Sequence, residues 1–326
     1  MKIANKLALS DKSSNPVINY LKDNAGTLIG LAGLTLVLSV TTTMFLAPDN
    51  LFNILRQVCT NATLAFGMTF VLIIGGIDLS VGSVLAASGV TVVILLERGM
   101  PCIPAILIGV LMGAVFGLIN GLIIAYTNMP PFIVTLATQM GIRGISYIIT
   151  SGRSVASTDP QFNAIGNGYI GPVPIPVLMV AILIVLSSII LNKTRFGRRM
   201  YATGGNVEAA VYSGIKVKTV QIWVYTICGI LASIGGIVLA SRMYSGQPTA
   251  GNAYEGDAIA AAVLGGTSFN GGIGTIGGTL IGALIIGVLN NGLNLLKVSF
   301  YWQLVIKGIV ILAAVYIDIL KKKKNK

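Results

Sequence analysis

Long apolar runs alternate with short polar segments along this chain, and the lengths of the runs indicate the class of protein. A membrane-spanning helix needs about 20 apolar residues. Backbone groups inside hydrocarbon must pair within their own segment, so each run predicts a helix and not an open sheet. The eighth of the ten runs is too short to span a membrane alone, and we expect a half-helix or a re-entrant element there. The runs lie at approximately 26–46, 53–74, 79–96, 103–125, 130–150, 173–191, 219–240, 257–269, 276–296 and 300–319.

The composition supports this assignment, since 54% of the 326 residues are hydrophobic and only 10% are charged. We predict an all-α polytopic membrane protein with about ten transmembrane helices in one domain over residues 26–320. An N-terminal arm (1–25) and a basic tail (321–326) flank this domain. The chain has no histidine, which excludes histidine-based catalytic triads, zinc sites and proton relays. Its three cysteines fit no metal-ligand spacing, so we expect no metal site. The few carboxylates in the apolar runs do not pair at a recognisable spacing, so we do not expect an intramembrane enzyme.

The formal charge of +12 indicates membrane topology and not nucleic-acid binding. Fifteen of the 22 basic residues lie in the arm, in a central loop (Asn192–Lys218) and in the tail. Lys and Arg accumulate on the cytoplasmic side of membrane proteins. We therefore place the N-terminus, the central loop and the C-terminus in the cytoplasm. Six spans lie between the N-terminus and the loop, and four lie between the loop and the C-terminus. Both numbers are even, as they must be if all three segments lie on the same side of the membrane.

The central loop carries the signals of a short helix. Asn206 can cap a helix that begins at Val207, and Gly214 can end it. A helix of two turns is unstable alone in water, so this helix is expected to pack against something. We predict a docking surface for a cytoplasmic partner; a basic loop lying on anionic lipid is the alternative. The candidate docking residues are Gly204, Gly205, Asn206, Val207, Glu208, Ala209, Ala210, Ser213 and Gly214.

Polar residues recur within the apolar runs, and a hydroxyl-rich solute such as a sugar would need amide and hydroxyl partners of this kind. Hydrogen bonds between helices use the same residue types and are the alternative. Asp78 either caps a helix that begins at Leu79 or lies at the pathway or a gate. Arg143 is expected to face the bundle interior. The candidate pathway residues are Asp78, Asn120, Gln139, Gln247, Asn290, Asn291 and Asn294.

Two pairs of segments resemble each other across the two halves of the chain. Gly76-Ile77-Asp78 and Gly256-Asp257 each precede a helix, and the motif at 117–122 resembles the motif at 287–293. The first pair belongs to the third and eighth of the ten runs, and the second pair to the fourth and ninth. An offset of five gives the members of each pair opposite orientations, as an inverted 5+5 repeat requires. The pathway would then lie between the halves.

The glycine-rich stretch Gly265–Gly278 is not a phosphate-binding loop. It lacks the Gly-Lys-Ser/Thr ending and follows no soluble strand. Close helix packing and a bend account for it better. The chain therefore has no visible nucleotide site, and we expect no cofactor of its own.

Several motifs together resemble the monosaccharide permeases of ABC importers, over about residues 51–318. Gln247-Pro-Thr-Ala-Gly251 and Asn290-Asn-Gly-Leu-Asn294 are most similar to ribose-type members, whereas Tyr301-Trp302-Gln303 also resembles galactose-type members. The shared motifs are Gly75-Gly-Ile-Asp-Leu-Ser-Val-Gly-Ser83, Thr194-Arg-Phe-Gly197, Gly204-Gly-Asn206, Tyr254-Glu255 with Asp257-Ala-Ile-Ala-Ala261, and Val263-Leu-Gly-Gly-Thr-Ser268.

The resemblance implies the permease subunit of an ATP-driven importer with a type II-like fold in the bacterial cytoplasmic (inner) membrane. It also implies a homodimer of permeases, cytoplasmic ATPase subunits that bind ATP and Mg²⁺, and an extracytoplasmic sugar-binding protein. The segment Gly204–Gly214 would be the coupling helix seated in an ATPase groove. Arg153 and Arg242, external by parity, are candidate contacts for the binding protein.

Ribose is the sugar that this resemblance implies, with galactose, xylose or another sugar as alternatives. The sugar would pass by alternating access and stay chemically unchanged. A rival of a different class is an ion-coupled secondary carrier, which could also use an inverted repeat. Such a carrier would need no binding protein and would not predict a capped, basic central loop.

Overall fold

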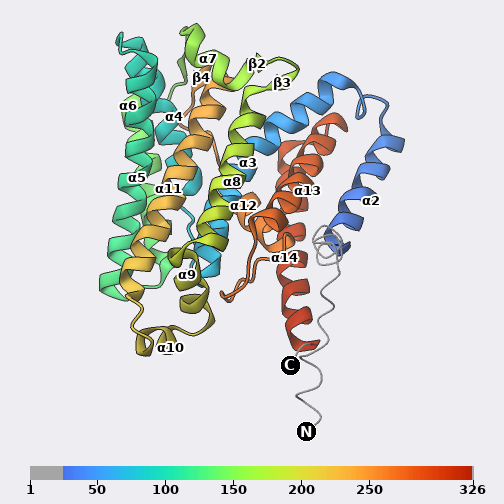
Figure 1. The fold of residues 1–326 in the computed structure, drawn as a ribbon. Coiled ribbons are helices and arrows are strands. Elements are labelled where there is room, and N and C mark those ends of the chain that lie inside the picture. Colours follow the sequence, from blue (N-terminus) through green and yellow to red (C-terminus); the bar gives the residue numbers. More distant parts are fainter. Residues whose placement is uncertain (1–24, 325–326) are drawn as a thin grey trace.

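The computed structural model describes residues 25–324, and nearly all regular structure in that range is helical (Figure 1). The predicted all-α class is confirmed for this part of the chain. Most of the N-terminal arm and the last two residues of the tail lie outside the described residues. The helices are α2 (Ala25–Thr41), α3 (Pro48–Ile73), α4 (Val81–Glu97), α5 (Cys102–Thr127), α6 (Pro131–Thr150), α7 (Pro160–Asn167), α8 (Ile175–Lys193), α9 (Arg195–Gly205), α10 (Val207–Tyr212), α11 (Val217–Arg242), α12 (Tyr254–Leu264), α13 (Ile276–Leu295) and α14 (Phe300–Lys324), and the strands are β1 (Val155–Ala156), β2 (Tyr169–Ile170), β3 (Val173–Pro174) and β4 (Ser245–Gly246).

Each of the ten predicted apolar runs coincides with a helix of this bundle, namely α2 to α6, α8 and α11 to α14. α12 has 11 residues, so the eighth run is too short to span a membrane alone, as predicted. Among the described helices, α5, α6, α8, α11 and α13 are long and apolar enough to cross a membrane. These five helices fit a multi-pass membrane protein, and the full count of ten spans stays a prediction.

The helices α3, α11 and α13 form the centre of the bundle. Most side chains of α11 and α13 are buried, and α3 is buried along its C-terminal part. By contrast, α5, α6 and α8 keep wide apolar faces exposed. In a membrane protein such faces contact lipid or another subunit, so the exposure is consistent with this class.

Glycines at every fourth position of α5 allow it to pack closely against α11. A Cβ on Gly113 would lie 2.5 Å from the Gly229 carbonyl oxygen. A Cβ on Gly117 or Gly121 would also meet the α11 backbone. Membrane helices associate largely through close packing, which small residues permit. This glycine row therefore holds the two helices at backbone contact.

Two segments without regular structure enter the bundle, 74–80 before α4 and 247–253 before α12. They meet where α4 starts, because a Cβ on Gly82 would overlap the Gly251 carbonyl oxygen. The same Cβ would lie 2.8 Å from Glu255 Oε2 in the first turn of α12. The third and eighth predicted runs thus begin close together inside the protein.

The glycine-rich stretch after α12 forms a packed turn. Gly271 and Gly272 have φ values of +87° and +76°, a backbone conformation that glycine adopts readily. A Cβ on Gly265 would overlap the Gly278 carbonyl oxygen at the start of α13. The close packing and the bend predicted for this stretch are both confirmed.

The two ends of the bundle carry different elements (Figure 1). One end carries α7 and the strands, where β1 pairs antiparallel with β4 and β2 with β3. The other end carries α9, α10 and the C-terminal end of α14. The central loop and the end of α14 therefore share one end of the molecule, as the charge-based topology requires.

Candidate functional site

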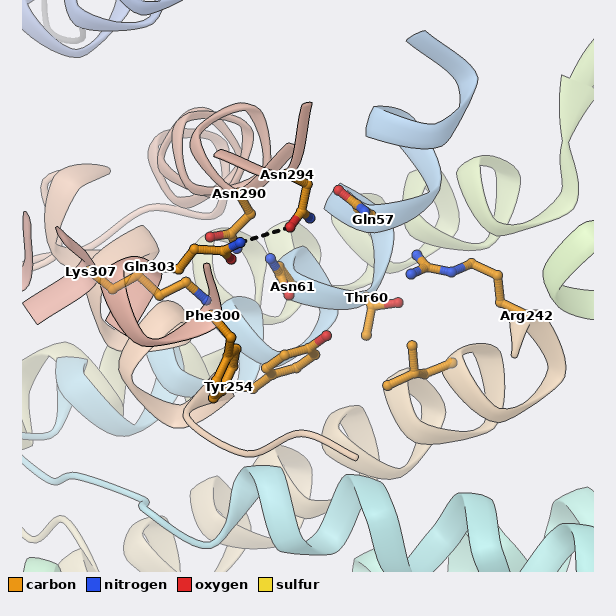
Figure 2. A pocket seen from close by; sticks show the side chains of 11 residues that line it. Gln57, Thr60, Asn61, Arg242, Tyr254, Asn290, Asn294, Phe300, Gln303 and Lys307 are labelled. Carbon is orange, nitrogen blue, oxygen red and sulfur yellow. Dashed lines mark hydrogen bonds between the residues drawn. The ribbon is translucent and has the colours of Figure 1, made fainter. Parts of the chain in front are cut away.

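Two polar pockets adjoin each other near the end of the bundle that carries α7. The inner pocket has a volume of about 170 Å³ and the outer pocket one of about 290 Å³. Gln57 and Arg242 line both, so the two pockets lie on either side of these side chains. The inner pocket is lined by Gln57, Thr60, Asn61, Leu239, Arg242, Tyr254, Asn290, Asn294, Phe300, Gln303 and Lys307 (Figure 2), and the outer pocket by Asn53, Arg56, Gln57, Asn167, Arg242 and Asn291.

Four side chains of the inner pocket hold a buried polar atom that has no hydrogen-bond partner among the described residues. These atoms are Gln57 Oε1, Thr60 Oγ1, Arg242 Nη1 and Asn290 Oδ1. Buried polar groups are rarely left unpaired, because an unpaired group costs roughly 1–3 kcal/mol. The amide oxygens accept, the guanidinium donates and the hydroxyl does both. The pocket therefore suits a solute whose groups both donate and accept.

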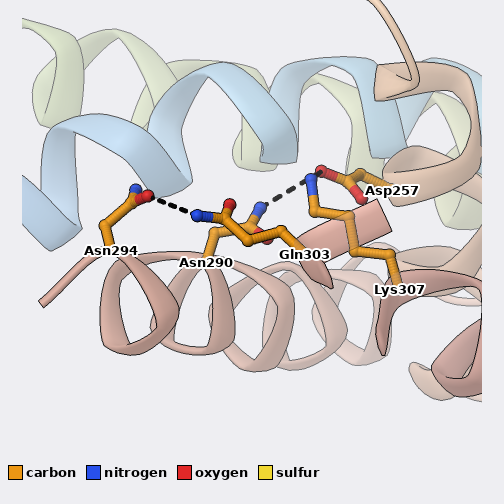
Figure 3. A network of polar contacts seen from close by, with 5 residues as sticks. All are labelled: Asp257, Asn290, Asn294, Gln303 and Lys307. Atoms are coloured by element: carbon orange, nitrogen blue, oxygen red, sulfur yellow. Dashed lines mark hydrogen bonds and ion pairs between the residues drawn. The ribbon is translucent and has the colours of Figure 1, made fainter. Parts of the chain in front are cut away.

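A series of polar contacts ties α12, α13 and α14 together along one wall of the inner pocket (Figure 3). Lys307 Nζ lies 2.8 Å from Asp257 Oδ2, in the one ion pair found among the described residues. The Asn290 amide donates to the same oxygen at 3.1 Å. Gln303 Nε2 donates to Asn294 Oδ1 at 2.9 Å. These contacts fix the directions of the side chains that face the pocket.

The structure brings three of the seven predicted pathway residues to these pockets. Asn290 and Asn294 line the inner pocket and Asn291 lines the outer one. Asn291 also exchanges amide hydrogen bonds with Asn50, at 2.8 and 3.1 Å. One helix thus directs neighbouring asparagines to different pockets. Their role in transport stays a prediction.

Asp78 and Asn120 meet in a separate buried cluster that lines neither pocket. Asp78 Oδ1 accepts from the backbone N–H of Ser80 at 2.9 Å and from its hydroxyl at 2.6 Å. Asn120 Nδ2 donates to the same hydroxyl at 2.9 Å. The helix α4 begins at Val81, so the predicted cap on a helix starting at Leu79 is wrong. Asp78 instead stabilises the turn before α4, because its carboxylate bonds the backbone two residues further on.

Gln139 and Gln247 also lie outside the two pockets. Gln139 Nε2 is 3.3 Å from Glu255 Oε1, and Gln247 bonds a neighbouring serine hydroxyl at 3.1 Å. On the same helix as Gln139, Arg143 donates to two backbone carbonyls of the segment 247–253, at 2.7 and 2.6 Å. Arg143 therefore faces the protein, as predicted, and ties α6 to the segment that leads into α12.

The short helix predicted in the central loop is present as α10. The Asn206 side chain accepts from the backbone N–H of Ala209 at 2.9 Å, and Glu208 lies in the first turn. Gly214, with φ +76°, follows the last turn. Ala210 is buried, whereas Val207 and Val211 are exposed and Tyr212 is 91% exposed. The helix therefore presents apolar side chains outward from the end of the bundle.

The base of the central loop is seated on the bundle through backbone contacts. A Cβ on Gly204 would overlap the Ile73 carbonyl oxygen at the end of α3. The Tyr201 hydroxyl donates to the Gly274 carbonyl oxygen at 2.6 Å. Burial raises the pKa of the Tyr201 phenol, so the group stays protonated and keeps donating. The base of the central loop therefore packs directly against α3 and the glycine-rich turn.

The two arginines predicted to contact a binding protein have different surroundings. Arg153 is exposed just after α6. Arg242 is half-buried and lines both pockets, where no described side chain accepts a hydrogen bond from it. Arg56 also lines the outer pocket, and its Cζ atom lies 4.9 Å from the centroid of the Tyr169 ring. Docking at Arg153 or Arg242 stays a prediction.

Several pocket residues were not among the predicted candidates. Gln303 and Lys307 are four positions apart, a spacing that places them on one face of α14. That spacing was a usable signal, because few other residues of the predicted run 300–319 are polar. The tertiary fold alone brings in the others. Among the missed residues are Asn53, Arg56, Gln57, Thr60, Asn167, Leu239, Tyr254, Phe300, Gln303 and Lys307.

Comparison with known proteins gives the chain a family. Residues 50–315 match the family described as branched-chain amino acid transport system / permease component. The ribose import permease of Bacillus subtilis is 50% identical over 295 residues, covering 90% of this chain and 92% of that protein. The ribose import permease of Escherichia coli K12 is 45% identical over 296 residues (89% and 92%), and the D-allose transport system permease of the same strain is 40% identical over 304 residues (92% and 93%). No solved structure is a significant match. The chain therefore belongs to this family of transport-system permease components, and its resemblance to monosaccharide permeases is confirmed.

Proposed function

We propose that this chain is the transmembrane permease subunit of an ATP-driven importer that carries ribose into the cell by alternating access. The inner pocket carries the proposal, because four of its side chains hold unpaired polar atoms inside a largely apolar bundle. Polar groups inside a membrane protein are costly and commonly mark a solute pathway. Relatives named ribose import permeases support ribose, and those named allose and xylose permeases indicate the alternative sugars.

The chemistry of the inner pocket suits a neutral sugar. Each sugar hydroxyl both donates and accepts, which matches the mixture of amide, hydroxyl and guanidinium groups in the lining. Tyr254 and Phe300 add aromatic rings, which offer an apolar surface to the C–H groups of a sugar ring (Figure 2). The sugar would enter through the outer pocket, since that pocket adjoins the inner one at Gln57 and Arg242.

Alternating access then requires the inner pocket to open toward the end that carries α10. We propose that α4 and α12 take part in this step. Both follow irregular segments and begin inside the bundle, as discontinuous helices of transporters do at their binding sites. Their position supports the inverted 5+5 repeat and the ten-span topology that we propose for the chain.

We propose that α10 is the element that receives motion from the ATPase. Its exposed apolar side chains would lie in a groove of the ATPase subunit, which binds ATP and Mg²⁺. Closure of the ATPases on ATP would then move α9 and α10 as a rigid body. The contacts of Gly204 and Tyr201 with the base of the bundle would pass this motion to the helices.

The complete importer would be a homodimer of this chain with two ATPase subunits and an extracytoplasmic sugar-binding protein. Both termini and α10 would lie in the cytoplasm, and α7 with the strands would face the binding protein. The localisation would be the bacterial cytoplasmic membrane. The shared end of α10 and α14 supports this orientation, together with the basic residues of the central loop and the tail.

Removing the Thr60 hydroxyl tests directly whether the sugar binds in the inner pocket. The hydroxyl has no described partner, so Thr60→Val removes one polar group of the pocket and breaks no hydrogen bond of the fold. We expect ribose uptake by the reconstituted importer to fall about two- to tenfold, since a hydrogen bond contributes roughly 0.5–1.5 kcal/mol.

Thr63→Val is the matched control on the same helix. The Thr63 hydroxyl bonds the Cys59 carbonyl oxygen at 2.8 Å and does not line the pocket. Uptake by this variant should stay within twofold of the wild-type rate. Equal uptake by wild-type and Thr60→Val protein would contradict the placement of the sugar in the inner pocket.

A further inference from the structure

Lys307, at the wall of the inner pocket, has N–H donors that no described residue accepts. An ammonium group has three N–H donors and no acceptor. One donor meets Asp257 Oδ2 at 2.8 Å, and no other hydrogen bond joins Lys307 Nζ to the described residues. The Lys307 side chain is 15% exposed and lines the pocket, whereas Asp257 is 2% exposed and does not. A solute in the pocket can therefore reach the ammonium but not the carboxylate.

Asn290 is the second side chain that Asp257 holds in place. Asn290 donates to the same carboxylate oxygen at 3.1 Å, and this contact uses its amide nitrogen. Its Oδ1 atom is buried and has no described partner. Asp257 thus holds an ammonium and an amide side by side, with donors free on one and an acceptor free on the other (Figure 3).

We infer that Lys307 binds a hydroxyl group of the transported sugar and is a specificity-determining residue of the pathway. Asp257 is the positioning residue, which holds Lys307 and Asn290 through one oxygen. The N–H donors of Lys307 that Asp257 leaves free suit a sugar hydroxyl, whose oxygen accepts. This inference rests on the proposed function, because it takes the inner pocket as the sugar site.

The ion pair between Lys307 and Asp257 could instead serve only to hold α12 and α14 together. A buried ion pair contributes little net stability, because the desolvation of both charges offsets their attraction. An apolar pair of similar volume would tie the helices at least as well. A purely structural pair would also show no preference among sugars that differ in one hydroxyl. Selectivity for single hydroxyls therefore separates the two roles.

The test measures sugar binding to the full-length chain in lipid nanodiscs by saturation-transfer NMR. The probes are ribose and its 2-deoxy, 3-deoxy and 5-deoxy analogues, with wild-type and Lys307→Met protein. We expect Lys307→Met to raise the Kd of ribose about 10- to 100-fold, the range for a hydrogen bond to a charged group. For one deoxy analogue the Kd should be the same in both proteins, because the hydroxyl that Lys307 binds is already missing.

Lys297→Met is the matched control, since Lys297 is an exposed lysine after α13 that lines neither pocket. It should bind all four sugars as the wild type does. The double variant Asp257→Asn/Lys307→Met leaves no unpaired buried charge, so it guards against misfolding of the single variant. It should show the same loss of selectivity for one hydroxyl.

An equal loss of affinity for all four sugars would overturn the assignment and leave Lys307 a structural role. Unchanged affinities would overturn it as well. If the wild-type chain binds none of the sugars, the pocket proposal itself fails. That outcome is distinct from a wild type that binds ribose and does not depend on Lys307.

Discussion

Polar side chains inside this bundle divide into those paired through every polar atom and those that keep an unpaired one. Asn291 pairs with Asn50 through both amide atoms, so it fits the interhelical hydrogen bonding that was the alternative for every buried amide. Asn120 bonds Ser80 through Nδ2 but keeps an unpaired Oδ1. Thr60 keeps an unpaired hydroxyl at the inner pocket. Sequence could not separate the two groups, because helices that are apolar all round show no polar face. Only the tertiary contacts reveal which polar atoms are unpaired.

Gly113 tests the close packing of α5 on α11. In Gly113→Ala the new Cβ would lie 2.5 Å from both the Gly229 carbonyl oxygen and the Ser233 Cβ. Neither neighbour is the far end of a flexible side chain, so the helices must move apart. We expect a loss of about 1–3 kcal/mol in the free energy of unfolding. Thermal unfolding of the purified protein in detergent measures this loss.

Gly141→Ala provides the matched control, because no atom lies within 4 Å of a Cβ built on this exposed glycine of α6. Alanine favours the helix by roughly 1 kcal/mol over glycine, so this variant should unfold at the same or a higher temperature. If Gly113→Ala is as stable as Gly141→Ala, the close approach of α5 and α11 is wrong.

Elements with local signals were predicted best. The cap at Asn206 and the glycine end of α10 depend on residues within a few positions of one another, and both are present. The start of α4 was placed two residues early, because Asp78 forms a turn with Ser80 before the helix begins. Local preferences indicated that α10 would form but did not show how α9 is seated against α3.

The exposed face of α10 should be required for coupling and dispensable for folding. In the double variant Val207→Ser/Val211→Ser, two exposed apolar side chains become polar, so the proposed seat in the ATPase groove is weakened. We expect at least a tenfold loss of ATP-driven ribose uptake, with an unchanged unfolding temperature. Both are measured on the same preparation in proteoliposomes and detergent.

Ile273→Ser is the control for this prediction. Ile273 is an exposed apolar residue of the glycine-rich turn, which contacts the base of the central loop. It lies outside α10, so uptake should be retained. A Val207→Ser/Val211→Ser variant that transports at the wild-type rate would contradict the coupling role of α10.

Over the whole chain, sequence patterns predicted where the ten apolar helices lie and that the central loop and the C-terminal helix share one end. The length of an apolar run and the charge of a segment are sums over many residues, so misjudging one residue changes neither prediction much. The pockets could not be predicted from the sequence, because residues such as Gln57 and Lys307 are about 250 positions apart and meet only in the folded bundle. Motifs spread over the chain predicted the family, which the relatives confirm.

We propose that this chain moves ribose only when an ATPase subunit drives it. The most direct measurement is uptake of radiolabelled ribose into proteoliposomes that contain this chain, its ATPase and its sugar-binding protein. Uptake should require ATP and Mg²⁺, should stop when the ATPase is omitted, and should not respond to a proton or sodium gradient. Ribose accumulation driven by an ion gradient, without the ATPase, would contradict the account and show an ion-coupled carrier.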